Sequence, residues 1–356
     1  IYSDSTHLDS MVFIQGPRKF KPKHLVNYIR IRKGDLFKQR ARIATIRKLT
    51  AMNIFQYVSI RYSADTLHGD TMGLLNASVQ LSPYKKRSLR VEMQGVTKSN
   101  NFAGPGLIVA YTNRNLFRGG EIYEISGNAS YETQIAKGSV KGLGSFQFGI
   151  QNSLTIPRIF PFKIKSSGGY SIPKTKFGFN VSLVSRVQFY RMNSFQFEYG
   201  FKWNSSRFIS HELNPIDLIY SNVFGTTPEF DAILEKNTFL AQSFEDQFIP
   251  GLSYSFLFNQ FTDNKREHRF FFKATADIAG NLFGGIQTVF KQEKLIFGLP
   301  YAQYLKADID ARHYARVGRE SLWITRIFAG WGVPYGKSST LPYIKQYFSG
   351  GPNSIR

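Results

Sequence analysis

The chain contains no cysteine among its 356 residues, so a disulfide framework and a thiolate metal site are both excluded. It also has no run of about 18 apolar residues, the length that a transmembrane helix needs. The N-terminus, Ile1–Asp4, lacks the basic and then apolar character of a signal sequence. Either a signal has been removed or the sequence begins within a longer protein, and we favour the second interpretation.

Catalytic motifs are equally scarce. The six histidines are scattered, and there is neither a Gly-x-Ser-x-Gly elbow nor a nucleotide-binding loop. Asp308 and Asp310 could form a carboxylate pair, but Lys306 and Arg312 flank them and favour charge compensation. The sequence therefore predicts a protein that is not an enzyme and that uses no cofactor and no metal.

Aromatic and basic residues, by contrast, are abundant. The chain has 33 Phe and 19 Tyr, yet its mean hydropathy is only −0.25. This combination suits a membrane β-barrel, in which lipid-facing and lumen-facing residues alternate. The net charge of +22 is interpreted mainly as basic residues at alternate strand positions that line a lumen. Anionic lipid remains a candidate partner, whereas nucleic acid is disfavoured.

Residues 10–84 are predicted to form a small α+β domain. Apolar residues at helical spacing indicate two helices, and short runs bounded by turn residues indicate three strands. The expected order is strand, helix, helix, strand, strand, over residues 11–16, 21–31, 38–52, 55–62 and 74–81. The basic residues of the second helix (Lys38, Arg40, Arg42, Arg47 and Lys48) are interpreted as a solvated face.

From residue 88 onward the pattern changes to a period of two. Between Phe195 and Trp203, for example, an aromatic residue occupies every second position and polar residues or glycine lie between them. Such alternation predicts strands with one apolar and one polar face. Eleven strands are expected, over residues 88–97, 104–114, 120–133, 143–154, 176–190, 193–204, 206–220, 248–261, 267–280, 300–316 and 319–332.

Two features favour a transmembrane antiparallel β-barrel over a soluble sandwich. Charges follow one another on one face of a strand at Asp308, Asp310 and Arg312. Aromatic residues also gather near the strand ends, as they do in interfacial girdles, at Trp203, Tyr220, Tyr301, Trp323 and Trp331. The fold class is therefore mainly β, a barrel of about eleven strands preceded by the small α+β domain.

The odd strand count predicts which loops share a side. If the N-terminal domain is periplasmic, residues 221–247 and the Gly350-Gly351 segment lie outside the cell, whereas residues 155–175 lie on the periplasmic side. Residues 229–235 predict a short helix in the outer loop, with Pro228 near its start.

The end of the chain resembles a known motif. An aromatic-rich approach leads to Gly350, Gly351, Pro352, Asn353, Ser354, Ile355 and Arg356. This segment is similar to the lid loop of the BamA/TamA superfamily of outer-membrane assembly barrels. The run from Asn113 to Gly120 supports the resemblance, and Arg32–Phe37 with Asn53–Val58 resemble a POTRA domain. The family's motif continues with Gly-Phe and five further barrel strands, which this sequence does not contain. The sequence does not distinguish strands that are deleted, strands that lie on another chain and strands outside the given sequence.

The resemblance implies a periplasmic POTRA-like domain at 1–87 and, from 88–356, the N-terminal part of a sixteen-stranded barrel in the bacterial outer membrane. It implies that Arg356 reaches acidic and aromatic groups on the inner wall. The implied partners are unfolded outer-membrane protein clients, outer-membrane lipid and accessory assembly subunits. The sequence does not separate the assembly core from a TamA-like paralogue.

The first barrel strand is the candidate working site. It contains Ser88, Leu89, Arg90, Val91, Glu92, Met93, Gln94 and Gly95. An unpaired strand edge offers free N–H and C=O groups to another strand, and a client must satisfy such groups before it enters lipid. In the family the seam between the first and last strands is understood as a lateral gate. The simpler interpretation is a strand that closes the barrel.

Three functions follow from these observations. The first is assembly and insertion, or translocation, of β-barrel proteins through the lateral gate. The second is a two-partner secretion transporter of the same superfamily. The third is a passive porin, for which Lys306, Asp308, Asp310 and Arg312 would be lumen charges.

Overall fold

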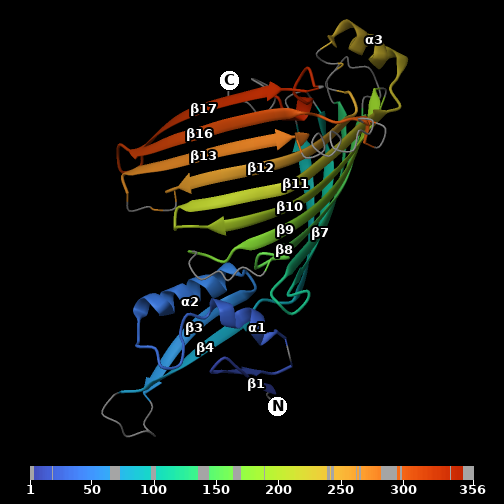
Figure 1. Cartoon of the computed structure of the whole chain (residues 1–356). Coiled ribbons are helices and arrows are strands. Elements are labelled where there is room, and N and C mark those ends of the chain that lie inside the picture. The colour runs from blue at the N-terminus through green and yellow to red at the C-terminus, as the bar shows by residue number, and fades with distance from the viewer. Residues whose placement is uncertain are drawn as a thin grey trace.

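The computed structural model (Figure 1) shows a small N-terminal domain followed by one large, curved β-sheet. No helix in the described part of the chain is long and apolar enough to cross a membrane. The structure describes residues 4–17, 19–64, 73–97, 102–134, 144–162, 170–187, 189–238, 241, 244–261, 263, 266–281, 295–296, 299–336 and 338–347.

The large sheet contains eleven antiparallel strands in sequence order, each paired with its neighbours along the chain. A separate pair of short strands, β14 (Leu295–Ile296) and β15 (Leu299–Pro300), lies between β13 and β16 in the sequence. The strands of the large sheet are β5 (Arg87–Thr97), β6 (Phe102–Arg114), β7 (Ile122–Gln134), β8 (Gly144–Ile156), β9 (Lys174–Arg186), β10 (Tyr190–Asn204), β11 (Ile209–Phe224), β12 (Gln247–Asn259), β13 (His268–Ala279), β16 (Tyr304–Arg316) and β17 (Leu322–Pro334).

The pairing register keeps like residues on like faces across the sheet. Phe197 of β10 lies opposite Phe179 of β9, and its neighbour Gln196 lies opposite Asn180. On β13 and β16, Ala274 pairs with Ile309, and Lys273 pairs with Asp310. Because side chains alternate between faces, the sheet has one apolar face and one polar face.

The prediction of a mainly β chain is confirmed, and each of the eleven predicted strands corresponds to a strand of this sheet with ends shifted by at most four residues. One shift has a clear cause. The predicted strand 176–190 ends at Arg186, because Phe189 and Tyr190 turn toward Phe230 at ring distances of 5.8 and 5.2 Å.

The N-terminal domain contains two short antiparallel sheets and two helical segments. Strands β1 (Asp4–Leu8) and β2 (Met11–Gln15) form one hairpin, and β3 (Phe55–Ala64) and β4 (Leu75–Pro83) form another. The helical segments are α1 (Pro22–Leu25), which continues into a 3-10 turn (Val26–Tyr28), and α2 (Gln39–Ala51).

Three details of this domain differ from the sequence prediction. Lys48, interpreted as part of a solvated face, is only 2% exposed. Strand β1 was not predicted, because its turn uses Asp9 and Ser10 with positive φ values of 50° and 63° and contains no glycine. The predicted helix 21–31 is shorter, because the backbone becomes extended at Ile29, which is buried in the domain core.

The domain core is apolar and includes a residue from the large sheet's connections. Its buried members are Leu25, Tyr28, Ile29, Leu49, Met52, Ile54, Phe55 and Ile172. Ile172 belongs to the connection between β8 and β9, so this connection packs against the N-terminal domain. The domain and the connection therefore share one hydrophobic cluster.

The loops separate onto two ends of the sheet as the strand count predicts. The β8–β9 connection contacts the N-terminal domain, whereas α3 (Pro228–Lys236) lies at the opposite end (Figure 1). Helix α3 is the helix expected at 229–235. The Thr227 side chain caps it by accepting a hydrogen bond from the Phe230 amide at 3.3 Å.

Candidate functional site

Strand β5 forms one margin of the large sheet. Among the described residues it pairs with β6 alone, so its other edge carries backbone groups without a ladder partner. The residues of the predicted edge strand, Ser88 to Gly95, all lie on β5. On the apolar face, Leu89, Val91 and Met93 are 67%, 60% and 85% exposed. The client-pairing role assigned to these residues stays a prediction.

The polar face of β5 carries charged and hydroxyl side chains. Arg90 lies 3.9 Å from Glu92 along the same strand, and Arg114 of β6 donates to the Ser88 hydroxyl at 3.1 Å. These contacts stay within β5 and β6, so they leave the outer edge of β5 open.

The opposite margin of the sheet is β17. In the described part of the chain it pairs only with β16, and most of its side chains are exposed. Trp323 and Trp331 lie near its two ends, with Ile327 between them. Both margins thus expose large apolar side chains on one face.

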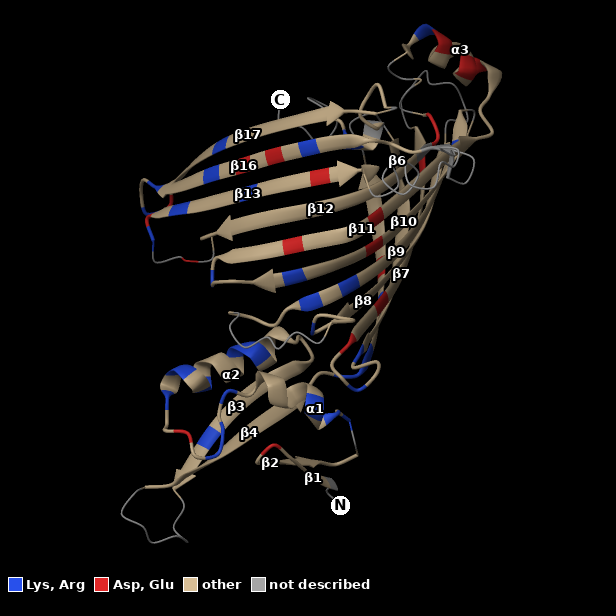
Figure 2. Ribbon diagram, viewed as in Figure 1, with Lys and Arg blue, Asp and Glu red and all other residues tan. Residues whose placement is uncertain are grey.

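The predicted lumen charges lie together on the polar face of β16, where Figure 2 shows charged residues following one another along the strand. Arg312 and Arg326 of β17 both contact the Asp310 carboxylate, at 2.6 and 3.0 Å. Lys306 lies 3.9 Å from Asp308. The arrangement is one of compensated charges, because each of the two carboxylates contacts at least one basic side chain.

The segment after β17 folds back onto this polar face. Tyr347 donates to Asp308 at 3.2 Å, and the Lys306 ammonium lies 4.2 Å from the centre of its ring. Its ring also meets Phe328 edge-on at 5.8 Å. Two residues earlier, Lys345 donates to Asp277 of β13 at 2.7 Å. We call residues 341–347 the docked tail.

Two glycines of β17 make room for the docked tail. Gly330 and Gly332 occupy alternate positions on the polar face, opposite Asp308 and Lys306. A Cβ atom at Gly330 would overlap the ring of Tyr347, and one at Gly332 would lie 2.7 Å from Leu341. Side chains at these two positions would compete for the space that Tyr347 and Leu341 occupy.

The lid-loop motif itself, Gly350 to Arg356, lies outside the described residues. The docked tail precedes it in the sequence. Sequence reasoning missed the tail residues Lys345 and Tyr347, although the glycines at alternate positions of β17 were an available signal.

The histidines of the large sheet are engaged in ring contacts. His211 stacks on Trp203 at 5.0 Å, and His313 stacks on His268 at 5.3 Å. Within the described residues, no group of three or more His, Asp or Glu side chains is placed to hold a metal ion.

Comparison with known proteins gives a match by structure only. No protein-family model and no curated protein matches the sequence. The crystal structure of BamA from Haemophilus ducreyi lacking POTRA domains 1–3 matches with a TM-score of 0.59 and 12% sequence identity. The match covers 100% of this chain and 64% of the BamA chain, so this chain spans less than two thirds of that protein's length. The eleven-stranded antiparallel sheet and this match show that the chain has the BamA-type barrel fold.

Proposed function

We propose that this chain belongs to an outer-membrane protein that inserts β-barrel clients, and that a client strand pairs with the edge of β5. The observation that carries the proposal is the position of β5, which among the described residues pairs with β6 alone and lies at the margin of a sheet whose strands present one apolar face. The likeness to BamA supports it at the level of the fold.

The physical reason lies in the cost of unpaired backbone groups in lipid. An unsatisfied N–H or C=O group costs several kcal/mol in the hydrocarbon region, where no water can bind it. A client strand that pairs with β5 satisfies these groups before it leaves water. In this scheme affinity depends on the client's backbone more than on its side chains, because the ladder uses only backbone groups.

The remaining parts of the chain take consistent places in this proposal. Outer-membrane lipid covers the apolar face, the N-terminal domain (residues 1–87) is POTRA-like and periplasmic, and α3 lies on the outer side. The lid-loop motif, Gly350 to Arg356, follows the docked tail in the sequence and is assigned the role of a lid. The protein works without a cofactor and is not an enzyme, and its partners are unfolded clients and accessory assembly subunits.

The proposal is tested with the full-length protein in lipid vesicles and a urea-unfolded outer-membrane client. Successive residues of a strand direct their N–H groups to opposite edges, so Val91→Pro and Glu92→Pro remove one N–H from each edge of β5. We expect one of the two variants to fold normally and yet fail to insert the client, measured by protease protection of the client. Val91→Ile is the matched control and keeps insertion at the native rate.

The competing functions give different results in the same vesicles. If both proline variants fold and insert the client at the native rate, pairing at β5 is excluded. A porin would conduct ions through vesicles without any client, and its conductance would respond to Lys306→Ala or Arg312→Ala. A two-partner secretion transporter would move its client into the vesicle interior and leave none inserted in the bilayer.

A further inference from the structure

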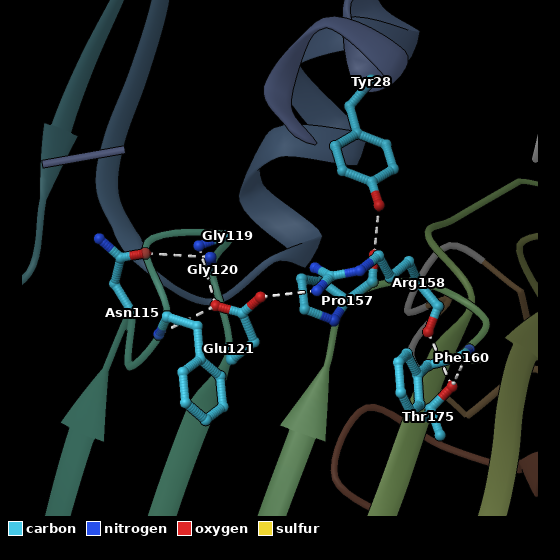
Figure 3. Close-up of polar contacts among 10 residues, drawn as sticks. Tyr28, Asn115, Gly119, Gly120, Glu121, Pro157, Arg158, Phe160 and Thr175 are labelled. Carbon is cyan, nitrogen blue, oxygen red and sulfur yellow. Dashed lines mark hydrogen bonds and ion pairs between the residues drawn. The ribbon is translucent and has the colours of Figure 1, made fainter. Parts of the chain in front are cut away.

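The turn between β6 and β7 contains a carboxylate that is almost completely buried. Glu121 is only 1% exposed, and Figure 3 shows its side chain within this turn. One oxygen accepts hydrogen bonds from the amides of Gly119 at 2.8 Å and Phe117 at 3.3 Å. The other oxygen accepts from Arg158 of the β8–β9 connection at 2.8 Å. A buried charge needs such partners, so Glu121 holds two turns together.

The same turn reaches into the N-terminal domain. Its residue Asn115 donates to the Lys19 carbonyl at 2.7 Å, and the Lys21 amide donates to the Arg118 carbonyl at 2.8 Å. Gly120 has a φ of +85°, and a Cβ there would lie 2.6 Å from Met52 in the domain core. Only glycine permits this approach.

The β8–β9 connection holds the domain from a second side. The Tyr28 hydroxyl donates to the Pro157 carbonyl, next to Arg158 (Figure 3). Further along, Arg47 of α2 donates to the Tyr170 carbonyl at 2.8 Å, and its guanidinium lies 3.8 Å from the centre of that ring. With Ile172 in the domain core, this connection contributes polar and apolar contacts.

The start of β5 is also hydrogen-bonded to the junction between the domain and the sheet. Only three residues separate the end of β4 at Pro83 from the start of β5 at Arg87. The first of them, Tyr84, donates from its amide to the Ile54 carbonyl at 2.9 Å, and the Arg114 amide donates to the Lys86 carbonyl at 2.7 Å. The linker is therefore bonded to the domain at one end and to β6 at the other.

We propose that Glu121 and Arg158 are positioning residues that lock the N-terminal domain to the barrel, so that the domain and the edge of β5 keep a fixed relation. This inference rests on the proposed function, because it assigns the domain the task of presenting a client to β5. A domain that swings freely would release the client strand at varying distances from the edge. A locked domain delivers it to one place.

The chain contains no cysteine, so paired spin labels can measure this relation directly. Labels at Lys33→Cys on the domain and Arg319→Cys on a barrel hairpin give a distance distribution by pulsed electron paramagnetic resonance. We expect Glu121→Gln to broaden the distribution and to slow client insertion several-fold. Glu124→Gln, on the exposed polar face of β7, is the matched control and changes neither quantity.

A rescue experiment separates positioning from a general loss of structure. Cysteines at Lys21 and Arg118, whose backbones are hydrogen-bonded, form a disulfide across the junction of the Glu121→Gln protein. We expect oxidation to restore client insertion and reduction to abolish the rescue. A protein that stays slow when oxidised, a distribution that stays narrow in Glu121→Gln, or a broad distribution with native insertion would each overturn the inference. Failure of the unaltered protein to insert clients would instead overturn the proposed function, and the distance measurement would still decide the docking.

Discussion

The N-terminal domain and the large sheet place their apolar residues differently: the domain buries them in a core, whereas the sheet exposes them on one face. In the domain, Leu49, Met52 and Ile54 are at most 1% exposed and form a core. In the sheet, Ile309, Trp323 and Ile327 are between 45% and 67% exposed and form an outer face. The domain thus buries these residues in a core, whereas an apolar surface of the sheet's extent requires a cover.

The two regions are also stabilised by different interactions. Tight apolar packing stabilises the domain, and so removal of core atoms there leaves a cavity. The sheet is held by backbone pairing along eleven strands, and in the proposed function lipid covers its apolar side chains. Substitutions at the two kinds of apolar position should therefore have different effects.

The largest expected effect is in the domain core. Leu49→Ala should destabilise the domain by about 2–5 kcal/mol, because it opens a cavity at a fully buried site of α2. Loss of hydrogen-exchange protection at the α2 amides measures this effect. Ile43→Ala, on the exposed side of the same helix, is the control and should change stability by about 0.5 kcal/mol or less. Equal effects at the two sites would contradict the assigned core.

The next effect tests the apolar face of the sheet. Ile309→Arg, near the middle of β16, should cost about 2–4 kcal/mol in a lipid bilayer, since it places a charge where lipid is expected. The matched Ile43→Arg in the domain should cost about 0.5 kcal/mol or less. Urea titrations of the protein in vesicles measure both. A protein that tolerates arginine at position 309 as well as at position 43 would not have a lipid-covered face.

A smaller effect is expected where the tail meets the sheet. Gly330→Ala should weaken docking of the tail by about 1–3 kcal/mol, because the new methyl group overlaps the Tyr347 ring. Trypsin cleavage after Lys345, which is paired with Asp277 in the docked tail, should become faster. The control is Gly127→Ala, where the nearest atom lies 3.9 Å from the added carbon. Unchanged cleavage in Gly330→Ala would mean that the tail does not rely on this space.

The smallest effect is a loosening of the domain–barrel junction in acid. Burial alone would raise the pKa of Glu121, but the hydrogen bond from Arg158 and those from backbone amides outweigh it, so its pKa is lowered from 4.5. Burial, and then Arg158, lower the pKa of His24 from 6.5. Other titratable groups beside them are Tyr28, Lys21 and Lys23.

Both shifts have the same sign for stability. Each group binds its proton less readily in the folded protein than in the unfolded chain, so stability is full above the ordinary pKa and is lost as pH falls. We expect the spin-label distribution to broaden first below pH 6.5, as His24 gains a proton, and further below pH 4.5. A distribution that is independent of pH between 7 and 4 would contradict the roles of these two groups.

The sequence predicted the sheet better than the junction for a physical reason. Alternation such as that of Phe195 to Trp203 is local, and it determines both the strand and its two faces. Contacts such as Glu121 with Arg158, 37 positions apart, depend on two turns meeting at one end of the sheet. A local sequence pattern does not predict that these two turns come into contact.

The candidate site divides in the same way. The position of β5 follows from the strand count, and so Ser88 to Gly95 could be predicted as a margin of the sheet. Docking of Tyr347 over Gly330 depends on the register of β17 and on the return path of the chain, which no local pattern contains. The alternate glycines indicated space on that face, but they did not indicate that Tyr347 fills it.

The central claim, that a client strand pairs with the edge of β5, is tested most directly by cross-linking. Val91 of β5 and Val109 of β6 lie opposite each other on the apolar face, so Val91→Cys and Val109→Cys differ mainly in their distance from the open edge. Each is oxidised with a stalled client that carries single cysteines along its terminal strand. We expect Val91→Cys to form disulfides in one register of the client strand, with client cysteines that lie two residues apart on the same face. Val109→Cys should form none. Equal cross-linking of the two positions, or cross-links that show no period of two, would contradict the claim.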